Sequence, residues 1–225
     1  MEKATKKEVK KMTLKSLIKK SITGAALVAT LYTAPAIAKE KPKLNLGFNA
    51  LETALTQIGD VRSRLYTNLS LTIGDAYLGF HGMNETNNLF KGYYFGRQTL
   101  IAGKKDSGTK GIVVIKIDKQ GIFDKKIGIR NTSLVEKLGG YGFIDLTADK
   151  DSANITAFYG KPIAKGTTFE ILQAAELPFK GKPGYYTEAL INKDVYKKLY
   201  AFCRAEMIDF DPEKVTIMGG LAVKF

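Results

Sequence analysis

The longest regular pattern in the sequence is an alternation of side-chain character over residues 61–73. The odd positions are mainly apolar, and the even positions are polar or amphipathic. Successive side chains of a β-strand point to opposite faces, so a period of two predicts a strand that separates two different environments. The alternation continues for 13 residues, whereas strands in globular proteins usually have about 5–6. We therefore predict an unusually long strand.

Similar segments follow to the end of the chain, separated by turn-forming residues such as Gly, Asp, Asn, Ser and Pro. We predict strands at residues 44–50, 61–73, 76–83, 89–102, 111–118, 122–130, 139–148, 153–160, 167–175, 184–192, 196–207 and 214–225. Helical periodicity is limited to residues 50–57 and 131–137, and for each we predict a helical turn within a loop. The chain is therefore expected to be all-β.

The N-terminal residues contain the three parts of a secretory signal peptide in their required order. A lysine-rich segment precedes an apolar run over residues 22–34, and Ala36 and Ala38 then form the small-residue pattern of a cleavage site. A membrane-spanning helix needs about 20 mostly apolar residues, so an uncleaved anchor is the weaker alternative. We predict a cleaved signal peptide at residues 1–38, with Met12 as an alternative start.

Cleavage would change the charge of the chain. Residues 1–38 hold eight lysines and two glutamates, so their removal lowers the formal charge from +13 to +7. The remaining basic residues form no dense patch, and an exported protein does not meet nucleic acid, so we expect no nucleic-acid partner. Cys203 is the single cysteine, and no intramolecular disulfide can form. An exported chain must then depend on a packed core, a partner or a membrane.

The C-terminal strand carries apolar residues at every second position. Counting back from Phe225 gives Val223, Leu221 and Ile217, with Gly219 as an interruption. This strand resembles the last strand of bacterial outer-membrane β-barrel (porin-like) proteins, which ends in an aromatic residue preceded by alternating apolar residues. In that family the last strand is recognised by the barrel assembly machinery and closes the barrel. The resemblance implies that Phe225, Val223, Leu221 and Ile217 are the barrel-assembly signal and face lipid.

Together, these features predict an antiparallel up-and-down transmembrane β-barrel. A closed barrel satisfies every backbone hydrogen bond in hydrocarbon. Spanning strands need about 9–11 residues, and bacterial barrels have even strand numbers, so we expect about 10–12 strands. We divide the chain into a signal peptide (1–38), an N-terminal segment with a candidate first strand (39–60) and the barrel (61–225). The expected location is the outer membrane, with its lipid and the assembly machinery as partners.

If the odd positions of residues 61–73 face lipid, the intervening side chains face the lumen. These are Arg62, Arg64 and Tyr66, and Arg204 and Glu206 take the same place in the predicted strand 196–207. An arginine-lined lumen would attract anionic solutes. Alternatively, Arg204 and Glu206 pair across the lumen and plug it, as charged residues do in small barrels. A passive channel for small solutes and a purely structural barrel are therefore both expected outcomes.

The sequence does not predict an enzyme. His81 is the only histidine and has no family motif around it, and it lies too far from Cys203 to suggest metal-ligand spacing. We expect no catalytic site, no cofactor and no metal. The segment 112–115 is apolar on both faces, as in a strand that is buried on both sides. It favours an alternative, a soluble periplasmic lipocalin-like or β-sandwich protein that binds an apolar ligand.

Overall fold

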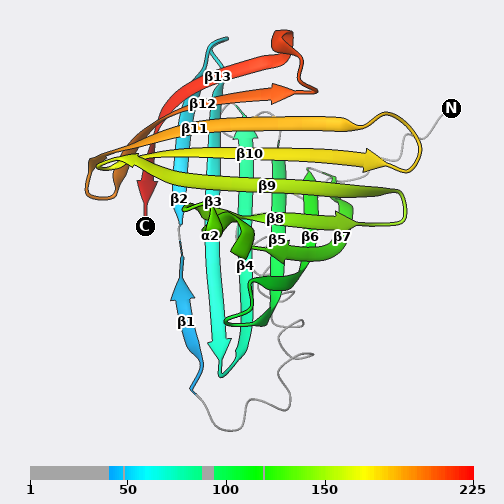
Figure 1. Cartoon of the computed structure of the whole chain (residues 1–225). Helices are drawn as coiled ribbons and strands as arrows, with labels where there is room; N and C mark the ends of the chain where they lie inside the picture. The colour runs from blue at the N-terminus through cyan, green and yellow to red at the C-terminus, as the bar shows by residue number, and fades with distance from the viewer. Residues whose placement is uncertain (1–40, 48, 88–93, 119) are drawn as a thin grey trace, which may run out of the picture.

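A computed structural model describes residues 41–47, 49–87, 94–118 and 120–225 (Figure 1). The predicted signal peptide, with Ala36 and Ala38, lies outside the described residues. No helix in the described ranges is long and apolar enough to cross a membrane.

The described residues form thirteen strands and two short helices. The strands are β1 (Lys43–Leu46), β2 (Ala50–Thr56), β3 (Val61–Ile73), β4 (Ala76–Asn87), β5 (Tyr94–Lys104), β6 (Thr109–Asp118), β7 (Gly121–Asn131), β8 (Tyr141–Ala148), β9 (Ser152–Ala164), β10 (Thr167–Pro178), β11 (Gly184–Tyr196), β12 (Leu199–Ile208) and β13 (Val215–Lys224). The helices are α2 (Ser133–Lys137) and the 3-10 helix η1 (Pro212–Lys214).

The strands β2 to β13 form a closed antiparallel barrel. Each pairs with the next strand along the chain, and β13 pairs with β2 over Met218–Lys224 to close it. The predicted all-β, up-and-down barrel is thereby confirmed, with twelve strands in the closed cylinder. Figure 1 shows β9–β12 crossing in front of β3–β5, with the C-terminus beside β2.

The first barrel strand differs from the prediction. Residues 50–57 were expected to form a helical turn, but β2 covers most of this segment and pairs with both β3 and β13. The segment is rich in Ala, Leu and Glu, which favour helices, and pairing on both edges overrides that preference. The predicted strand 44–50 corresponds to β1, which pairs with the C-terminal half of β3.

The strand boundary predicted at residue 196 also differs. The structure extends β11 to Tyr196 and turns at Lys197 and Lys198, so the next strand begins at Leu199. Lys197 has a positive φ of 43°, which non-glycine residues rarely adopt. This turn has none of the usual turn-forming residues, which explains why sequence patterns placed it inside a strand.

The two faces of the barrel wall differ in polarity. The outer face exposes large apolar side chains on most strands, including Leu51, Leu55, Ile155, Ile191 and Leu221. The inner face instead buries many polar and charged side chains. This is the reverse of a soluble globular protein, in which the core is apolar.

Apolar side chains nevertheless fill parts of the interior. Tyr200, Phe202 and Met218 form one buried cluster with smaller residues of β2 and β13. Ile112 and Val114 of β6 form another with Ile101. The segment 112–115 is therefore apolar on both sides because two of its residues pack inside the barrel while the other two lie on its outer face.

Candidate functional site

The interior of the barrel contains one large cavity of about 1080 Å³. Its lining residues come from both ends of the barrel. Gly166 and Lys224 lie at the end that holds the C-terminus, and Asp209 and Lys214 belong to the β12–β13 connection at the opposite end. The cavity therefore runs along the lumen and is not confined to one end.

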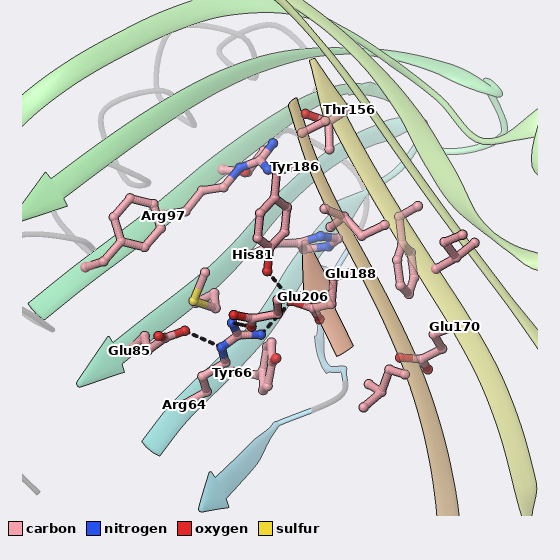
Figure 2. Close-up of a pocket in the computed structure, with 18 of the residues that line it drawn as sticks. Arg64, Tyr66, His81, Glu85, Arg97, Thr156, Glu170, Tyr186, Glu188 and Glu206 are labelled. Carbon is pink, nitrogen blue, oxygen red and sulfur yellow. Dashed lines mark hydrogen bonds and ion pairs between the residues drawn. The ribbon is translucent and has the colours of Figure 1, made fainter. Parts of the chain in front are cut away.

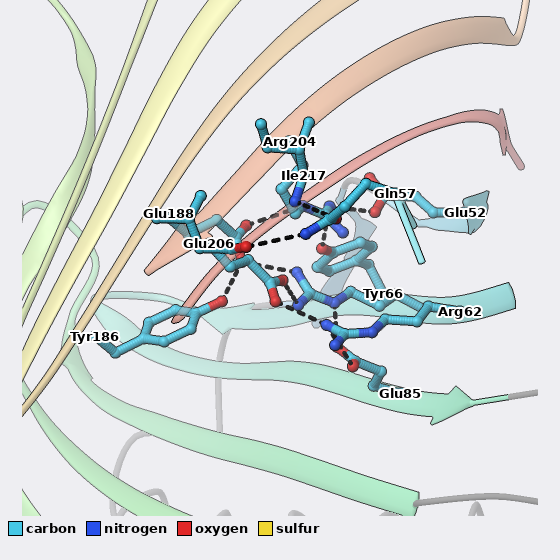
Figure 3. A network of polar contacts seen from close by, with 12 residues as sticks. Glu52, Gln57, Arg62, Tyr66, Glu85, Tyr186, Glu188, Arg204, Glu206 and Ile217 are labelled. Carbon is cyan, nitrogen blue, oxygen red and sulfur yellow. Dashed lines mark hydrogen bonds and ion pairs between the residues drawn. The ribbon is translucent and has the colours of Figure 1, made fainter. Parts of the chain in front are cut away.

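Seven charged residues form an arginine–glutamate network on one side of this lumen (Figure 3). Its members are Glu52, Arg62, Arg64, Glu85, Glu188, Arg204 and Glu206. They come from β2, β3, β4, β11 and β12. The strand β13 contributes no charged member, so the network extends across the β13–β2 seam at which the barrel closes.

Arg64 is the centre of the network. Its guanidinium donates to Glu85 on the adjacent strand β4 and to Glu206 on β12, and its Nη1 lies 2.8 Å from Glu188 Oε2 on β11. Arg62 also binds Glu206, with its Nη1 2.8 Å from Glu206 Oε2. Strands that are distant around the wall are thus joined by side chains that meet inside the barrel.

Arg204 is the most deeply buried member, with 1% of its surface exposed. It donates to Glu52 and to Tyr66 Oη, the latter at 3.1 Å, and its Nε lies 3.2 Å from Glu188 Oε1. Tyr200 also donates to Glu52, over 3.0 Å. A buried charge is costly unless it is paired and hydrogen-bonded, and these contacts supply both.

A second group, the Arg130–Asp145 cluster, lies on strands β4, β5, β7 and β8. Arg130 forms a two-pronged ion pair with Asp145, with N···O distances of 2.7 and 2.8 Å. Its third nitrogen, Nη1, lies 2.9 Å from His81 Nδ1. Arginine can only donate, so Nδ1 accepts, and a neutral His81 carries its proton on Nε2. Arg97 is more loosely held, with Nη2 3.6 Å from Asp145 Oδ2.

A third contact fixes the β8–β9 connection to the wall. Lys126 Nζ on β7 lies 2.7 Å from Asp149 Oδ2 and 2.5 Å from Ser152 Oγ. The backbone N–H groups of Asp151 and Ser152 donate to Asp149 Oδ1. The hydrogen bond from Lys126 and these two backbone donors hold the pKa of Asp149 well below its usual range.

The structure places the residues that were singled out from the sequence as follows. Arg62, Arg64, Tyr66 and Glu206 line the cavity, and Arg204 is buried behind them. The residues of the proposed assembly signal lie on the outer face, all about half exposed or more: Ile217, Leu221, Val223 and Phe225.

Of the acidic partners, Glu206 was predicted to face the lumen, whereas Glu52, Glu85 and Glu188 were missed by sequence reasoning. Glu188 could have been found from the alternation of Tyr186, Glu188 and Leu190, which places them on one face of β11. Glu52 was hidden by the helical interpretation of residues 50–57. Among the described residues, no group of three or more His, Cys, Asp or Glu side chains is arranged to hold a metal ion.

Among the described residues, the charges that line the cavity are balanced, with eight basic and eight acidic residues. No protein-family model and no curated protein matches the chain. The fold and the interior therefore define its class as a closed, twelve-stranded antiparallel β-barrel with a charged lumen and an apolar outer face.

Proposed function

We propose that this protein is an outer-membrane β-barrel that acts as a passive channel for small solutes. The observation that carries the proposal is a cavity lined from both ends, enclosed by a barrel whose outer face is apolar. A lipid bilayer stabilises such an outer face, because strands that span a bilayer direct their apolar residues to the lipid and their polar residues to the lumen.

Exposed aromatic residues at both edges of the barrel support a membrane location. Phe123, Phe179 and Phe210 lie at the end opposite the C-terminus, and Tyr196 and Phe225 lie at the C-terminal end. Aromatic side chains are enriched at both interfaces of membrane proteins, where they form two girdles. We further infer that residues 1–38 direct export and that the outward residues of β13 are recognised by the barrel assembly machinery.

The size of the cavity limits the solutes. If about 1080 Å³ is spread over a hydrocarbon core of ~30 Å, the mean cross-section is roughly 40 Å². This admits water, ions and small organic molecules in single file. The equal numbers of acidic and basic lining residues, with most arginines paired, favour weak ion selectivity over the anion preference that unpaired arginines would give.

Reconstitution tests this proposal directly. The purified protein in planar bilayers should give small conductance steps with weak selectivity, and proteoliposomes should take up glycerol faster than protein-free liposomes. Recovery of the protein in the soluble periplasmic fraction would contradict the membrane location and favour the alternative, a soluble protein that binds an apolar ligand. A stable barrel without any conductance would leave only a structural role.

A substitution on the outer face tests the membrane location separately. Ile191 lies near the middle of β11 and is 47% exposed. Ile191→Arg should lower the stability of the inserted barrel by about 2–4 kcal/mol, because an arginine near the bilayer midplane is costly. The matched control is Ile58→Arg, at an exposed residue of the β2–β3 turn, which should cost ~0–1 kcal/mol. Urea titration in liposomes measures both, and equal costs would argue against a bilayer around β11.

A further inference from the structure

We infer that the lumen recognises short peptides with free termini, and this inference rests on the proposed channel function. It depends on two charged side chains, Arg97 and Glu170, which both line the cavity and are the least neutralised of its arginines and glutamates in the described residues. Figure 2 shows them apart, on opposite sides of the pocket.

Arg97 has unused donor capacity. Among the described residues its one ion-pair partner is Asp145, and the nearest atoms are 3.6 Å apart. Both oxygens of Asp145 already accept hydrogen bonds from Arg130, at 2.7 and 2.8 Å. One carboxylate is thus shared by two guanidinium groups, which leaves a local excess of positive charge. The side chain of Arg97 is 23% exposed, so a solute carboxylate in the cavity can reach it.

Glu170 has unused acceptor capacity. Tyr141 Oη donates to its Oε1 over 2.5 Å, and within the described part of the chain no basic side chain forms an ion pair with it. The other glutamates of the same cavity each form an ion pair with a basic side chain, as Glu188 and Glu206 do with Arg64 and Glu176 does with Lys126. A carboxylate with one neutral donor and one open oxygen attracts an ammonium group.

The strand register gives the spacing between these two sites in the direction of the strands. Asp145, which marks the position of the Arg97 guanidinium, lies in a row with Thr156 across β8 and β9. Glu170 lies in the row of Tyr141, which is four residues further along the strands. At ~3.3 Å per residue, the rows are about 13 Å apart. A dipeptide spans about 7 Å, and a hydrogen bond of ~2.9 Å at each end brings the total to about 13 Å.

The row between the two charged sites is apolar. Phe143 and Phe158 are direct cross-strand partners with ring centroids 5.6 Å apart, and Leu172 pairs with Phe158 on its other side. Apolar side chains of a bound peptide would lie against these three residues. A simple anion or cation would meet attraction at one site and repulsion at the other, whereas a peptide with free termini is complementary to both.

The test uses alanylalanine in four forms: free, acetylated at the amino end, amidated at the carboxyl end, and blocked at both ends. Swelling of proteoliposomes that contain the full barrel measures the entry rate of each form, with glycerol as the reference solute. We expect the free dipeptide to enter several-fold faster than the doubly blocked form. Arg97→Gln and Glu170→Gln should each abolish this preference, when the rate of every dipeptide form is divided by the glycerol rate of the same variant.

Two substitutions outside the lumen serve as matched controls, since Lys180→Gln and Asp151→Asn remove the same charges from exposed loop residues. Both should keep the preference. Equal rates for the free and doubly blocked dipeptides would overturn the inference, as would a faster rate for either singly blocked form. If glycerol also fails to enter, the channel function itself is wrong; if glycerol enters, only the peptide recognition is.

Discussion

The two charged groups inside the barrel differ in which strands they connect. The main contact of the Arg130–Asp145 cluster, its two-pronged ion pair, joins β7 and β8, which already pair through their backbones. Its other contacts, to His81 on β4 and Arg97 on β5, stay on one side of the barrel seam. The arginine–glutamate network instead joins β3 to β11 and β12, which lie on opposite sides of the β13–β2 seam. The ion pair at the centre of the first group reinforces an existing strand pairing, whereas the second group makes contacts across the closing seam. We infer that the network holds the closing seam and limits the width of the lumen beside it.

Small side chains on the seam make this bridge possible. Ala50, Ala54 and Ala222 are buried on the inner face of β2 and β13. The larger buried side chains on these two strands are Met218 on β13 and Glu52 on β2, and Glu52 extends to Arg204 and Tyr200. Because the alanine side chains on the inner face of the seam project little into the lumen, arginines from β3 reach across the seam to glutamates on β11 and β12. The Arg130–Asp145 cluster needs no such space.

Removal of Arg204 should have the largest effect. Arg204→Ala leaves Glu52 without its arginine and Glu188 with Arg64 alone, and loss of one partner of a buried ion pair costs about 3–5 kcal/mol. Arg130→Ala should cost less, about 1–3 kcal/mol, because Arg97 already lies 3.6 Å from Asp145 and can move toward it. Urea unfolding of both variants in liposomes measures the difference.

The comparison also predicts different effects on the lumen. Arg204→Ala should raise single-channel conductance by loosening the seam, and Arg130→Ala should leave it close to the wild-type value. If Arg130→Ala is the more damaging of the two, the network does not have the special role in closure that its cross-seam contacts suggest.

Sequence patterns predicted which side chains face inward but not which of them meet. The period of two in residues 61–73 suffices to place Arg62, Arg64 and Tyr66 on one face. Their partners lie up to 144 positions away, as in the contact of Arg62 with Glu206. Such contacts depend on the strand number and on the closing register, and neither is encoded in a local pattern.

The two mistaken predictions, a helical turn at residues 50–57 and a strand that begins at residue 196, have a related cause. Residues 50–57 have helix-forming composition, and Lys197-Lys198 is an atypical turn, so local preference was misleading at both places. Tertiary pairing decides the structure there, through β13 for the first and through the match of β11 with β12 for the second. The short helix expected near residues 131–137 was found as α2, because a single helical turn depends on local contacts, such as the hydrogen bond from the Leu134 N–H to Asn131 Oδ1.

A glycine on the seam gives the next largest effect. A Cβ added to Gly220 would collide with the Thr53 carbonyl oxygen and approach Ala54 Cα to 2.8 Å, both of which are backbone atoms of β2. Gly220→Ala should therefore destabilise the barrel by about 1–3 kcal/mol through overpacking. At Gly219 the nearest atom would lie 3.8 Å away, so Gly219→Ala is the matched control and should be nearly neutral. Heat-modified gel mobility, read as the temperature at which the folded band disappears, compares the two variants with the wild type.

The smallest effect should come from a single hydroxyl of the network. Tyr200 is 1% exposed and donates to Glu52 over 3.0 Å, so Tyr200→Phe removes one hydrogen bond to a buried carboxylate and keeps the ring in place. Glu52 retains its contact with Arg204, and the expected cost is therefore about 0.5–1.5 kcal/mol. Tyr196→Phe, at a residue that is 64% exposed on the outer side of the C-terminal edge, is the control and should cost less.

Combining Tyr200→Phe with Arg204→Ala sharpens the comparison. If Glu52 links the two side chains, the double variant should be less stable than the sum of the single losses predicts, because each single variant leaves Glu52 one of these two donors; strict additivity would mean that they act on the seam independently.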